Sequence, residues 1–353
     1  MLHLFMSFAM MSDMKKSKPV TQSDVAKEAG VSRSMVSYVL NDTQGKTVAE
    51  ETKKRILDAI EKLAYRPNKY AQALQLGQSA FGGKQIGVIM SGSQIFLRPY
   101  YMEILSGIHK SALEKKHQIR FIVNFEDLKN PILFNELISA EMASGLILIA
   151  PDQCVKTERD FALAKKMQER ISNIVCVDSR LEGFSCARFS RRQAASQACS
   201  YLVKKGFKKI AYVGALDERV SGFKQTLLES SLKNSDPEIL GALDMEGGYY
   251  AASKLSEKRE LPDAVLAGSD EVAIGVLRLL DSKSVEVPRQ VALVSIDNIE
   301  LSAYTNPPLT TVNVEKAAMG RHAVEMIVHG NVGFGKDAVD ILLPLTLVER
   351  ESA

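Results

Sequence analysis

Several kinds of residue are scarce in this chain, and each scarcity excludes a class of structure. The 353 residues include no tryptophan, 4 cysteines and 5 histidines. The cysteines show no CxxC spacing, and His322 and His329 are too far apart to form an i, i+4 pair on one helix face. We therefore predict no metal, no cofactor, and free buried thiols in a reducing cytosol. The four thiols are those of Cys154, Cys176, Cys186 and Cys199.

Long apolar runs are also absent, and this excludes a membrane-spanning helix, which needs about 18 or more consecutive apolar residues. The opening segment, Met1–Lys16, is apolar enough to raise the question of a signal peptide. Its basic pair, Lys15-Lys16, follows the apolar run, and no small-residue cleavage site comes next. We expect residues 1–17 to be an unstructured extension of a cytoplasmic protein that has no membrane partner.

The overall charge is small, but its placement is uneven. The net charge is +3, with 25% of residues charged and 46% hydrophobic. The first 80 residues carry 12 Lys+Arg and 8 Asp+Glu, whereas the remaining residues carry 33 and 34. A small basic N-terminal region on a near-neutral body is typical of a protein that binds a polyanion with one end.

Residues 18–66, here called the headpiece, contain the pattern of a helix-turn-helix. Thr21 with Asp24 can cap a first helix, and Gly30 suits the left-handed position that ends it. Ser32 can cap a second helix over Arg33–Leu40. A tight glycine-containing turn between two short helices is typical of DNA-binding helix-turn-helix domains, although an alanine-rich helical hairpin remains the alternative.

A third amphipathic helix is predicted over Glu50–Ala64, with Ile56, Ile60 and Leu63 turned toward the same small core. Its start lacks the usual capping serine, since Ala49 stands there. Thr47, three residues before Glu50, is our expected substitute for that cap.

The ordered motifs of this region resemble the N-terminal signature of the LacI/GalR (lactose-repressor) family of bacterial transcriptional regulators. The resemblance is carried by Val20-Thr21-Gln22-Ser23-Asp24-Val25-Ala26-Lys27-Glu28-Ala29-Gly30-Val31-Ser32, Val36-Ser37, Val39-Leu40-Asn41, Glu51-Thr52-Lys53-Lys54-Arg55-Ile56 and Leu63-Ala64-Tyr65-Arg66-Pro67-Asn68. It implies double-stranded operator DNA as a partner.

The resemblance also implies roles for individual residues. The second helix is expected in the major groove, with base edges facing Arg33, Ser34 and Tyr38. Positions that the family uses near phosphates are matched by Thr21, Ser32, Ser37 and Asn41. After Pro67, a hinge helix over Asn68–Leu76, within a hinge and linker at residues 67–83, is expected to enter the minor groove.

Leu74 matches the family pattern, whereas Tyr38 departs from it. Leu74 falls where the family places a leucine wedge between base pairs, the alternative being an ordinary linker residue. Tyr38 stands where most members carry an arginine. Because a phenol cannot make the bidentate contact of a guanidinium with guanine, the usual half-site is not expected.

Residues 84–350 alternate short apolar runs with amphipathic segments, which indicates parallel sheets covered by helices. Strands are predicted at 84–90, 119–124, 145–150 and 174–178, then at 209–214, 264–267 and 291–296; helices are predicted at 100–116, 131–142 and 158–170 and between the later strands. Two such series of about 100 residues suggest two similar subdomains with a cleft at the carboxyl ends of their strands.

This half resembles the family's effector-binding core, which is similar to a periplasmic sugar-binding protein. The closest segments are Asp270-Glu271-Val272-Ala273-Ile274-Gly275, Val294-Ser295-Ile296-Asp297-Asn298, Asn306-Pro307-Pro308-Leu309-Thr310-Thr311-Val312 and Met319-Gly320. The expected fold is an all-α helix-turn-helix headpiece with a hinge helix, followed by an α/β periplasmic-binding-protein-like core of two doubly wound parallel-sheet subdomains.

Positions matching the family's effector contacts are Ser91, Asp178, Arg219, Tyr249, Ser269 and Asp297. Arg219 and Asp297 could hold vicinal hydroxyls through charge-assisted hydrogen bonds, and Tyr249 could stack on a sugar face. The alternatives are helix caps for the two aspartates and a core position for Tyr249.

The core also departs from the family pattern. An acidic residue and a glycine are usual around the position of Ser190-Arg191-Arg192, Ser269 replaces a common asparagine, and Tyr100 and Tyr101 follow Arg98-Pro99 near the first strand. These departures leave the effector open; a sugar or sugar derivative is expected, and a non-sugar effector is the alternative.

We expect a transcriptional regulator, a repressor, that is tuned by a small molecule and is a homodimer or a tetramer. An enzyme that uses Asp178, Asp270 and Asp297 as acid and base is disfavoured, because no nucleophile motif, phosphate loop or metal cluster accompanies them. An exported solute-binding protein is disfavoured by the headpiece and the missing signal.

Overall fold

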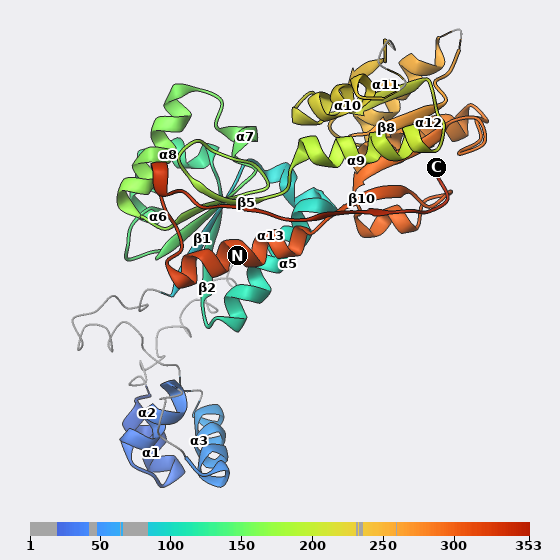
Figure 1. Cartoon of the computed structure of the whole chain (residues 1–353). Coiled ribbons are helices and arrows are strands. Elements are labelled where there is room, and N and C mark those ends of the chain that lie inside the picture. Colours follow the sequence, from blue (N-terminus) through green and yellow to red (C-terminus); the bar gives the residue numbers. More distant parts are fainter. Residues whose placement is uncertain are drawn as a thin grey trace, which may run out of the picture. The chain divides into compact units, whose positions relative to one another are not determined.

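A computed structural model describes residues 20–41, 48–63, 65, 84–230, 232, 236–258 and 260–353. The chain divides into two compact units, residues 1–80 and 81–353 (Figure 1). The predicted extension (residues 1–17) and the predicted hinge helix, with Asn68 and Leu74, lie outside the described residues.

The headpiece contains three helices, α1 (Gln22–Ala29), α2 (Arg33–Asn41) and α3 (Glu50–Lys62). The Thr21 side chain accepts a hydrogen bond from the Asp24 amide and the Asp24 side chain accepts one from the Thr21 amide, which forms a capping box. Gly30 ends α1 at φ 65°, and the Ser32 hydroxyl accepts from the Met35 amide. The predicted helix-turn-helix is therefore confirmed, caps included.

Three buried side chains, Val25, Val36 and Ile56, bring the three helices together around one small apolar core. The predicted extent of α3 was slightly wrong, because this helix ends at Lys62. Thr47, the predicted substitute cap, lies outside the described residues; Ala49 occupies the N-cap, and its side chain makes no capping hydrogen bond. Glu50 and Glu51 lie in the first turn instead, where their charge favours the positive end of the helix dipole.

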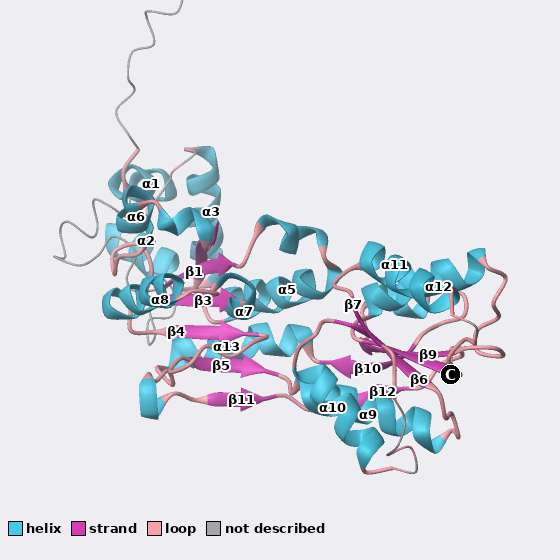
Figure 2. Ribbon diagram, turned by 90° about the horizontal axis from the view of Figure 1, so that it is seen from above, coloured by secondary structure: helices cyan, strands magenta, loops and turns pink. Residues whose placement is uncertain are grey.

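The first subdomain of the core is built on a six-stranded sheet, in which all strands are parallel. Its strand order is β11-β5-β4-β3-β1-β2. The strands are β1 (Gln85–Met90), β2 (Gln118–Asn124), β3 (Gly145–Ile149), β4 (Ile174–Val177), β5 (Ser185–Arg188) and β11 (Asp340–Leu342). One face carries α5 (Pro99–Glu114) and α13 (Lys316–His329), and the other carries α6 (Pro131–Leu137), α7 (Pro151–Cys154) and α8 (Glu158–Arg170) (Figure 2).

The second subdomain has a six-stranded sheet of order β12-β10-β9-β8-β6-β7, in which only β12 is antiparallel to its neighbour. The strands are β6 (Ile210–Gly214), β7 (Ile239–Gly241), β8 (Ala264–Ala267), β9 (Ala292–Asp297), β10 (Thr310–Val314) and β12 (Leu345–Val348). Its helices are α9 (Arg191–Lys204), α10 (Glu218–Leu228), α11 (Met245–Ser256) and α12 (Asp270–Ser282). Short 3-10 turns occur at Ser93–Leu97, Glu126–Lys129, Glu300–Ala303 and Gly335–Asp337.

The two subdomains are not two consecutive series, and this part of the prediction was too simple. The chain passes between the sheets three times, after β5, after β10 and between β11 and β12. The strands β5, β10, β11 and β12, which flank these passages, were not predicted. Strands β11 and β12 are short and largely exposed or half-buried, so they lack the apolar runs of the central strands. The predicted fold class of two doubly wound parallel-sheet subdomains is nevertheless confirmed.

Within the described ranges, no helix combines the length and apolarity that crossing a bilayer requires.

Candidate functional site

A cavity of about 460 Å³ lies between the two subdomains, and we call it the cleft. Most of its walls come from the segments that directly follow strands β1, β3, β4, β6, β7, β8 and β9. This position agrees with the rule that ligands of open parallel sheets bind beyond the carboxyl ends of the strands. The cleft is lined by Gln94, Arg98, Tyr100, Tyr101, Asp152, Gln153, Lys156, Asp178, Arg191, Ala215, Leu216, Asp217, Arg219, Ala242, Leu243, Gly268, Ser269 and Asp297.

Three non-glycine residues at these strand ends have left-handed backbones. Ala150, Asp178 and Asp297 have φ of 50°, 75° and 119°. Such conformations are strained for residues with a Cβ and persist where the surrounding structure holds them, often at functional sites.

Arg191 links the two sides of the cleft. It is the first residue of α9 in the second subdomain, yet its Nη1 lies 2.6 Å from Asp152 Oδ2 and its Nη2 lies 3.0 Å from Asp178 Oδ2 in the first subdomain. Burial disfavours the charged guanidinium, but Asp178 and Asp152 outweigh that effect and raise the pKa of Arg191. Burial likewise acts to raise the pKa of Asp152, but Arg191 brings it below its ordinary value. Both groups are therefore ionised at neutral pH.

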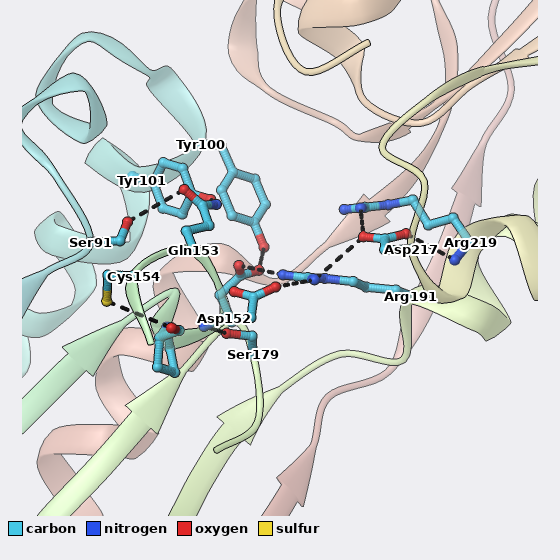
Figure 3. A network of polar contacts seen from close by, with 12 residues as sticks. Ser91, Tyr100, Tyr101, Asp152, Gln153, Cys154, Ser179, Arg191, Asp217 and Arg219 are labelled. Carbon is cyan, nitrogen blue, oxygen red and sulfur yellow. Dashed lines mark hydrogen bonds and ion pairs between the residues drawn. The ribbon is translucent and has the colours of Figure 1, made fainter. Parts of the chain in front are cut away.

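Arg219 lies on the opposite wall, in the first turn of α10. Its Nη1 lies 2.6 Å from Asp217 Oδ2, and its backbone amide donates to Asp217 Oδ1, so the aspartate both caps the helix and orients the guanidinium. Asp217 Oδ2 is also 3.4 Å from Arg191 Nη1. Figure 3 shows Asp217 between the two arginines. The two cations are thus held side by side by a shared carboxylate.

The first subdomain supplies an aromatic wall. Tyr100 donates to Asp178 Oδ1 at 2.6 Å, and its ring packs edge-on against Tyr101. Burial and the charge of Asp178 raise the pKa of Tyr100 well above its ordinary value, so the phenol keeps its proton and acts as a donor.

Arg98 reaches in the opposite direction to Arg191. From the N-cap of α5 it donates through Nε to Glu271 Oε2 at 2.8 Å and through Nη2 to the Leu243 carbonyl at 2.9 Å, both in the second subdomain. Its guanidinium also lies 5.6 Å from the Tyr101 ring centre. The two subdomains are therefore joined across the cleft by one arginine from each.

Asp297 ends β9 and is buried. Burial and the nearby charge of Asp270 raise the pKa of Asp297 well above its ordinary value. Burial raises the pKa of Asp270 to about 6, although the hydrogen bonds that it accepts from Ser295, Thr311 and the Ile299 amide favour its ionised form. Of the two acids, Asp297 is consequently the one that holds a proton more readily.

Four buried polar atoms at the cleft have no hydrogen-bond partner among the described residues. Two are donors, the Nε atoms of Arg191 and Arg219, and two are acceptors, Oδ1 of Asp152 and Oδ1 of Asp297. Because buried polar groups are normally paired, these atoms mark where a polar ligand could satisfy them.

The headpiece offers a separate polar face. Arg33 and Ser34 are exposed on α2, whereas Ser37 and Tyr38 are half-buried beside them. Arg33 Nε lies 3.5 Å from Gln22 Oε1 at the start of α1. Thr21 is exposed at the start of α1, and Ser32 is exposed at the start of α2. The predicted nucleic-acid residues of the first two helices thus lie on or next to one helix-turn-helix.

In the described ranges, no group of three or more His, Cys, Asp or Glu side chains is arranged to hold a metal ion.

Two family models match the chain. Residues 21–68 match the bacterial regulatory proteins of the lacI family, and residues 199–353 match a periplasmic binding protein-like domain. The chain belongs to the LacI family. It is a DNA-binding transcriptional regulator whose headpiece and two-sheet core are those of this family.

Curated LacI-family relatives match over nearly their whole length. The ribose operon repressor of Escherichia coli (strain K12) is 28% identical over 342 residues, which cover 94% of this chain and 99% of that protein. The HTH-type transcriptional repressor PurR of Klebsiella pneumoniae subsp. pneumoniae is 27% identical over 344 residues, covering 94% and 96%. These relatives are named as regulators, not as enzymes.

Solved structures show the same architecture. The Lac repressor dimer bound to operator and the anti-inducer ONPF has a TM-score of 0.73 and 25% identity, covering 95% of this chain and 99% of that chain. A complex of the transcriptional regulator CelR with cellobiose has a TM-score of 0.66 at 22% identity, covering 95% and 100%, and supports the fold alone.

Four of the six effector residues predicted from the LacI-family resemblance line the cleft: Asp178, Arg219, Ser269 and Asp297. Ser269 also caps α12 through a bond from the Val272 amide. Asp178 instead binds Tyr100 and Arg191, as a cleft carboxylate.

The other two predicted effector residues do not line the cavity. The Ser91 hydroxyl lies 3.4 Å from Gln153 Oε1, behind a lining residue. Tyr249 lies on α11, is 36% exposed and packs against Tyr250, so it is neither core nor cleft wall in this structure.

Sequence reasoning missed the residues that complete the network, namely Arg191, Asp152 and Asp217. Arg191 fell within a noted departure from the LacI-family pattern, and that departure was the available signal. Asp152 closely follows the strand predicted at 145–150, at the edge where a ligand was expected, and that position was a signal. No comparable signal marked Asp217, because its closeness to the others depends on the order of strands in two sheets.

Proposed function

We propose that this LacI-family regulator is a repressor whose DNA binding is controlled by a neutral polyhydroxylated effector, a sugar or sugar derivative, bound in the cleft. The observation that carries the proposal is the cavity of about 460 Å³ at the strand ends of both subdomains, with Arg219 and Asp297 in its walls. A ligand held there contacts both subdomains at once and so responds to their relative orientation.

The chemistry of the cleft favours hydroxyl groups. The unpartnered atoms comprise two N–H donors on arginines and two carboxylate acceptors, and a hydroxyl can donate and accept simultaneously. The lining side chains include four basic and four acidic groups, so their formal charges balance. This near balance of formal charges favours a ligand without a large net charge.

The known relatives support a carbohydrate. One homologue is named a ribose operon repressor, and solved family structures contain cellobiose in CelR and ribose in a regulator from Enterococcus faecium. Among the predicted contacts, Arg219 and Asp297 are the strongest candidates for paired hydroxyls. Ser269 and Asp178 extend the polar wall, whereas Ser91 and Tyr249 require a rearrangement to contact an effector.

For DNA, we propose that α2 lies in the major groove with Arg33, Ser34 and Tyr38 at base edges. Phosphate contacts are proposed for Thr21, Ser32, Ser37 and Asn41. The exposure of Arg33 and Ser34 supports this orientation. Asn68 and Leu74 remain the proposed hinge contacts.

The proposed regulation is a linkage between the two sites. An effector that favours one closure angle of the cleft shifts the spacing of two hinge segments in a homodimer and so changes operator affinity. Operator DNA must then change effector affinity by the same factor. We further propose a cytoplasmic homodimer without enzymatic activity; a tetramer is the alternative assembly.

The effector half of the proposal is tested with a thermal-shift screen of the full chain against sugars, nucleosides and amino acids. A sugar that binds the folded state raises the unfolding midpoint progressively with its concentration. Arg219→Gln should abolish that rise, and Arg278→Gln, an exposed arginine of α12, should retain it. A rise caused only by nucleosides or amino acids, or one unchanged in Arg219→Gln, would contradict the proposal.

The DNA half is tested with operators selected from random duplexes. Affinity should fall steeply and linearly on a log-log plot against salt, because phosphate contacts release counterions. Leu74→Ala should weaken operator binding far more than binding to random duplex, and Leu76→Ala serves as its neighbouring control. Equal losses of affinity for both kinds of DNA would contradict the proposed role of Leu74 as a wedge between base pairs.

A further inference from the structure

Arg191 is surrounded by acidic side chains in the wall of the cleft. Its guanidinium contacts three carboxylates, Asp152 and Asp178 of the first subdomain and Asp217 of its own subdomain, at 2.6, 3.0 and 3.4 Å. Figure 3 shows the side chain extending from α9 toward Asp152, with Asp217 on its other side. The protein thus places its own cation among three acids in the wall of the cleft.

The surrounding structure fixes these acids in position. Tyr100 donates to the second oxygen of Asp178, and the Asp152 backbone amide donates to the Ser179 hydroxyl. Asp217 is held as the N-cap of α10. The side chain of Arg191 is 13% exposed and that of Asp178 is 3% exposed, so solvent cannot replace the guanidinium without a change in structure. If the cation were removed, the buried carboxylate of Asp178 and the partly exposed carboxylates of Asp152 and Asp217 would face one another.

The contacts also bridge the subdomains. Arg191 belongs to the helix that begins just after the chain passes from the first sheet to the second. Its bonds to Asp152 and Asp178 return across that passage, so they must break or stretch if the cleft opens. A ligand in contact with both subdomains would form the same kind of bridge, and here a side chain already forms it.

We propose that Arg191 is a built-in cation of the cleft, which holds the subdomains together without an effector and excludes cationic ligands from the acidic site formed by Asp152, Asp178 and Asp217. As a specificity claim, the inference rests on the proposed function, because it assumes that effectors enter this cleft. The bridge itself does not depend on which effector binds. Arg191 accordingly leaves the rest of the cleft, around Arg219, Ser269 and Asp297, for the neutral ligand.

Replacing Arg191 with alanine should leave an acidic site that a small cation can bind. The variant should contain a guanidinium-sized space lined by three carboxylates, and methylguanidinium is the probe that fits it. The full-length wild type, Arg191→Ala and Arg192→Ala are compared by thermal unfolding in millimolar methylguanidinium chloride, with sodium chloride at equal ionic strength as the reference. Arg192 is the matched control, since it is the next residue on α9 and is exposed.

We expect Arg191→Ala to lower the midpoint of the core by about 4–8 °C, and Arg192→Ala by about 1 °C or less. Methylguanidinium should restore part of the loss in Arg191→Ala with saturation, and should leave the other two proteins unchanged. Small-angle scattering should show a larger radius of gyration for Arg191→Ala, reduced again by methylguanidinium. Equal midpoints for the two alanine variants, or an equal response of all three proteins to the probe, would overturn the proposal.

A second variant covers the case in which Arg191→Ala does not fold. Arg191→Lys keeps the charge but loses the fork that reaches two carboxylates. It should fold, with an unfolding midpoint below that of the wild type. Its radius of gyration should be above that of the wild type. Wild-type values for both quantities would exclude a bridging role. Methylguanidinium rescue without any sugar response would retain the bridge and reject the proposed effector class, so the two failures are distinguishable.

Discussion

The headpiece and the cleft are held together by contacts of very different range along the chain. In the headpiece, the capping contacts join residues three positions apart, such as Thr21 with Asp24 and Ser32 with Met35. In the cleft, Tyr100 and Asp178 are 78 positions apart, and Arg98 and Glu271 are 173 apart. Local patterns therefore reveal the first region, whereas the second exists only after the two sheets have formed.

The two regions also differ in how much apolar surface supports them. The headpiece core has few fully buried side chains, among them Val25, Val36 and Ile56. The sheets of the larger unit are buried on both faces, as the entirely buried strands β1 and β3 show. Small cores leave little surplus stability, so equal losses of packing energy should have unequal consequences.

The largest expected effect is the loss of stability when a substitution creates a cavity in either core. Ile56→Ala in α3 and Ile147→Ala in β3 both remove atoms from fully buried side chains, at a cost of about 2–5 kcal/mol each. The headpiece should unfold and lose DNA binding, whereas the core should remain folded with a lowered midpoint. Limited proteolysis with operator binding distinguishes these outcomes, and a headpiece that survives Ile56→Ala would contradict the comparison.

The second-largest expected difference is in the coupling free energies of ion pairs in the cleft and in the headpiece. A double-mutant cycle on Arg98 and Glu271, which are mostly buried, should give a coupling free energy of about 1–3 kcal/mol. The same cycle on Lys62 and Glu28 of the headpiece, with exposed fractions of 70% and 36%, should give about 0–1 kcal/mol. Thermal or denaturant unfolding of the single and double variants measures both. Equal couplings would show that burial across the cleft adds nothing.

Acid–base behaviour offers a third contrast. Because burial and Asp270 raise the pKa of Asp297, its folded form binds a proton more tightly than the unfolded chain does. This group therefore favours folding at acid pH and loses that advantage as pH rises through the raised pKa. Asp297→Asn should gain stability relative to the wild type from pH 4 toward neutrality.

The control for this pH experiment is Asp58→Asn, an exposed position on α3 of the headpiece. Its stability difference from the wild type should change little over the same pH range. Denaturant unfolding at a series of pH values measures both variants. A flat difference for Asp297→Asn would show that its carboxyl is not unusually protonated in the folded protein.

The smallest effect concerns one motif that occurs in both regions. Thr21 and Asp24 form a capping box on α1, and Thr157 and Asp160 form the same box on α8. Thr21→Ala and Thr157→Ala should each cost about 1 kcal/mol. The midpoint should fall by about 4–8 °C for the headpiece but only about 2 °C for the larger core, because the entropy of unfolding grows with size. Calorimetry with separate transitions checks this ratio.

Much of the fold was predictable because its signals are local. Gly30 ends α1, Ser32 begins α2, and the apolar runs at 145–150 and 264–267 become the buried strands β3 and β8. Short edge strands such as β11 were missed, since three residues with alternating exposure carry no clear period. Of the candidate site, Arg219 and Asp297 were found through resemblance, whereas Tyr249 lies outside the cavity.

The sequence by itself determined the headpiece helices, the caps of the first two and the parallel character of the core, because these depend on residues within about a dozen positions of one another. The tertiary structure decided that Arg191 lies between Asp152 and Asp178 and that Arg98 meets Glu271. These side chains come from different strand ends and helix starts, and their meeting depends on strand order and on three passages of the chain between the sheets. A linear pattern does not contain that information, because each of these residues is locally unremarkable.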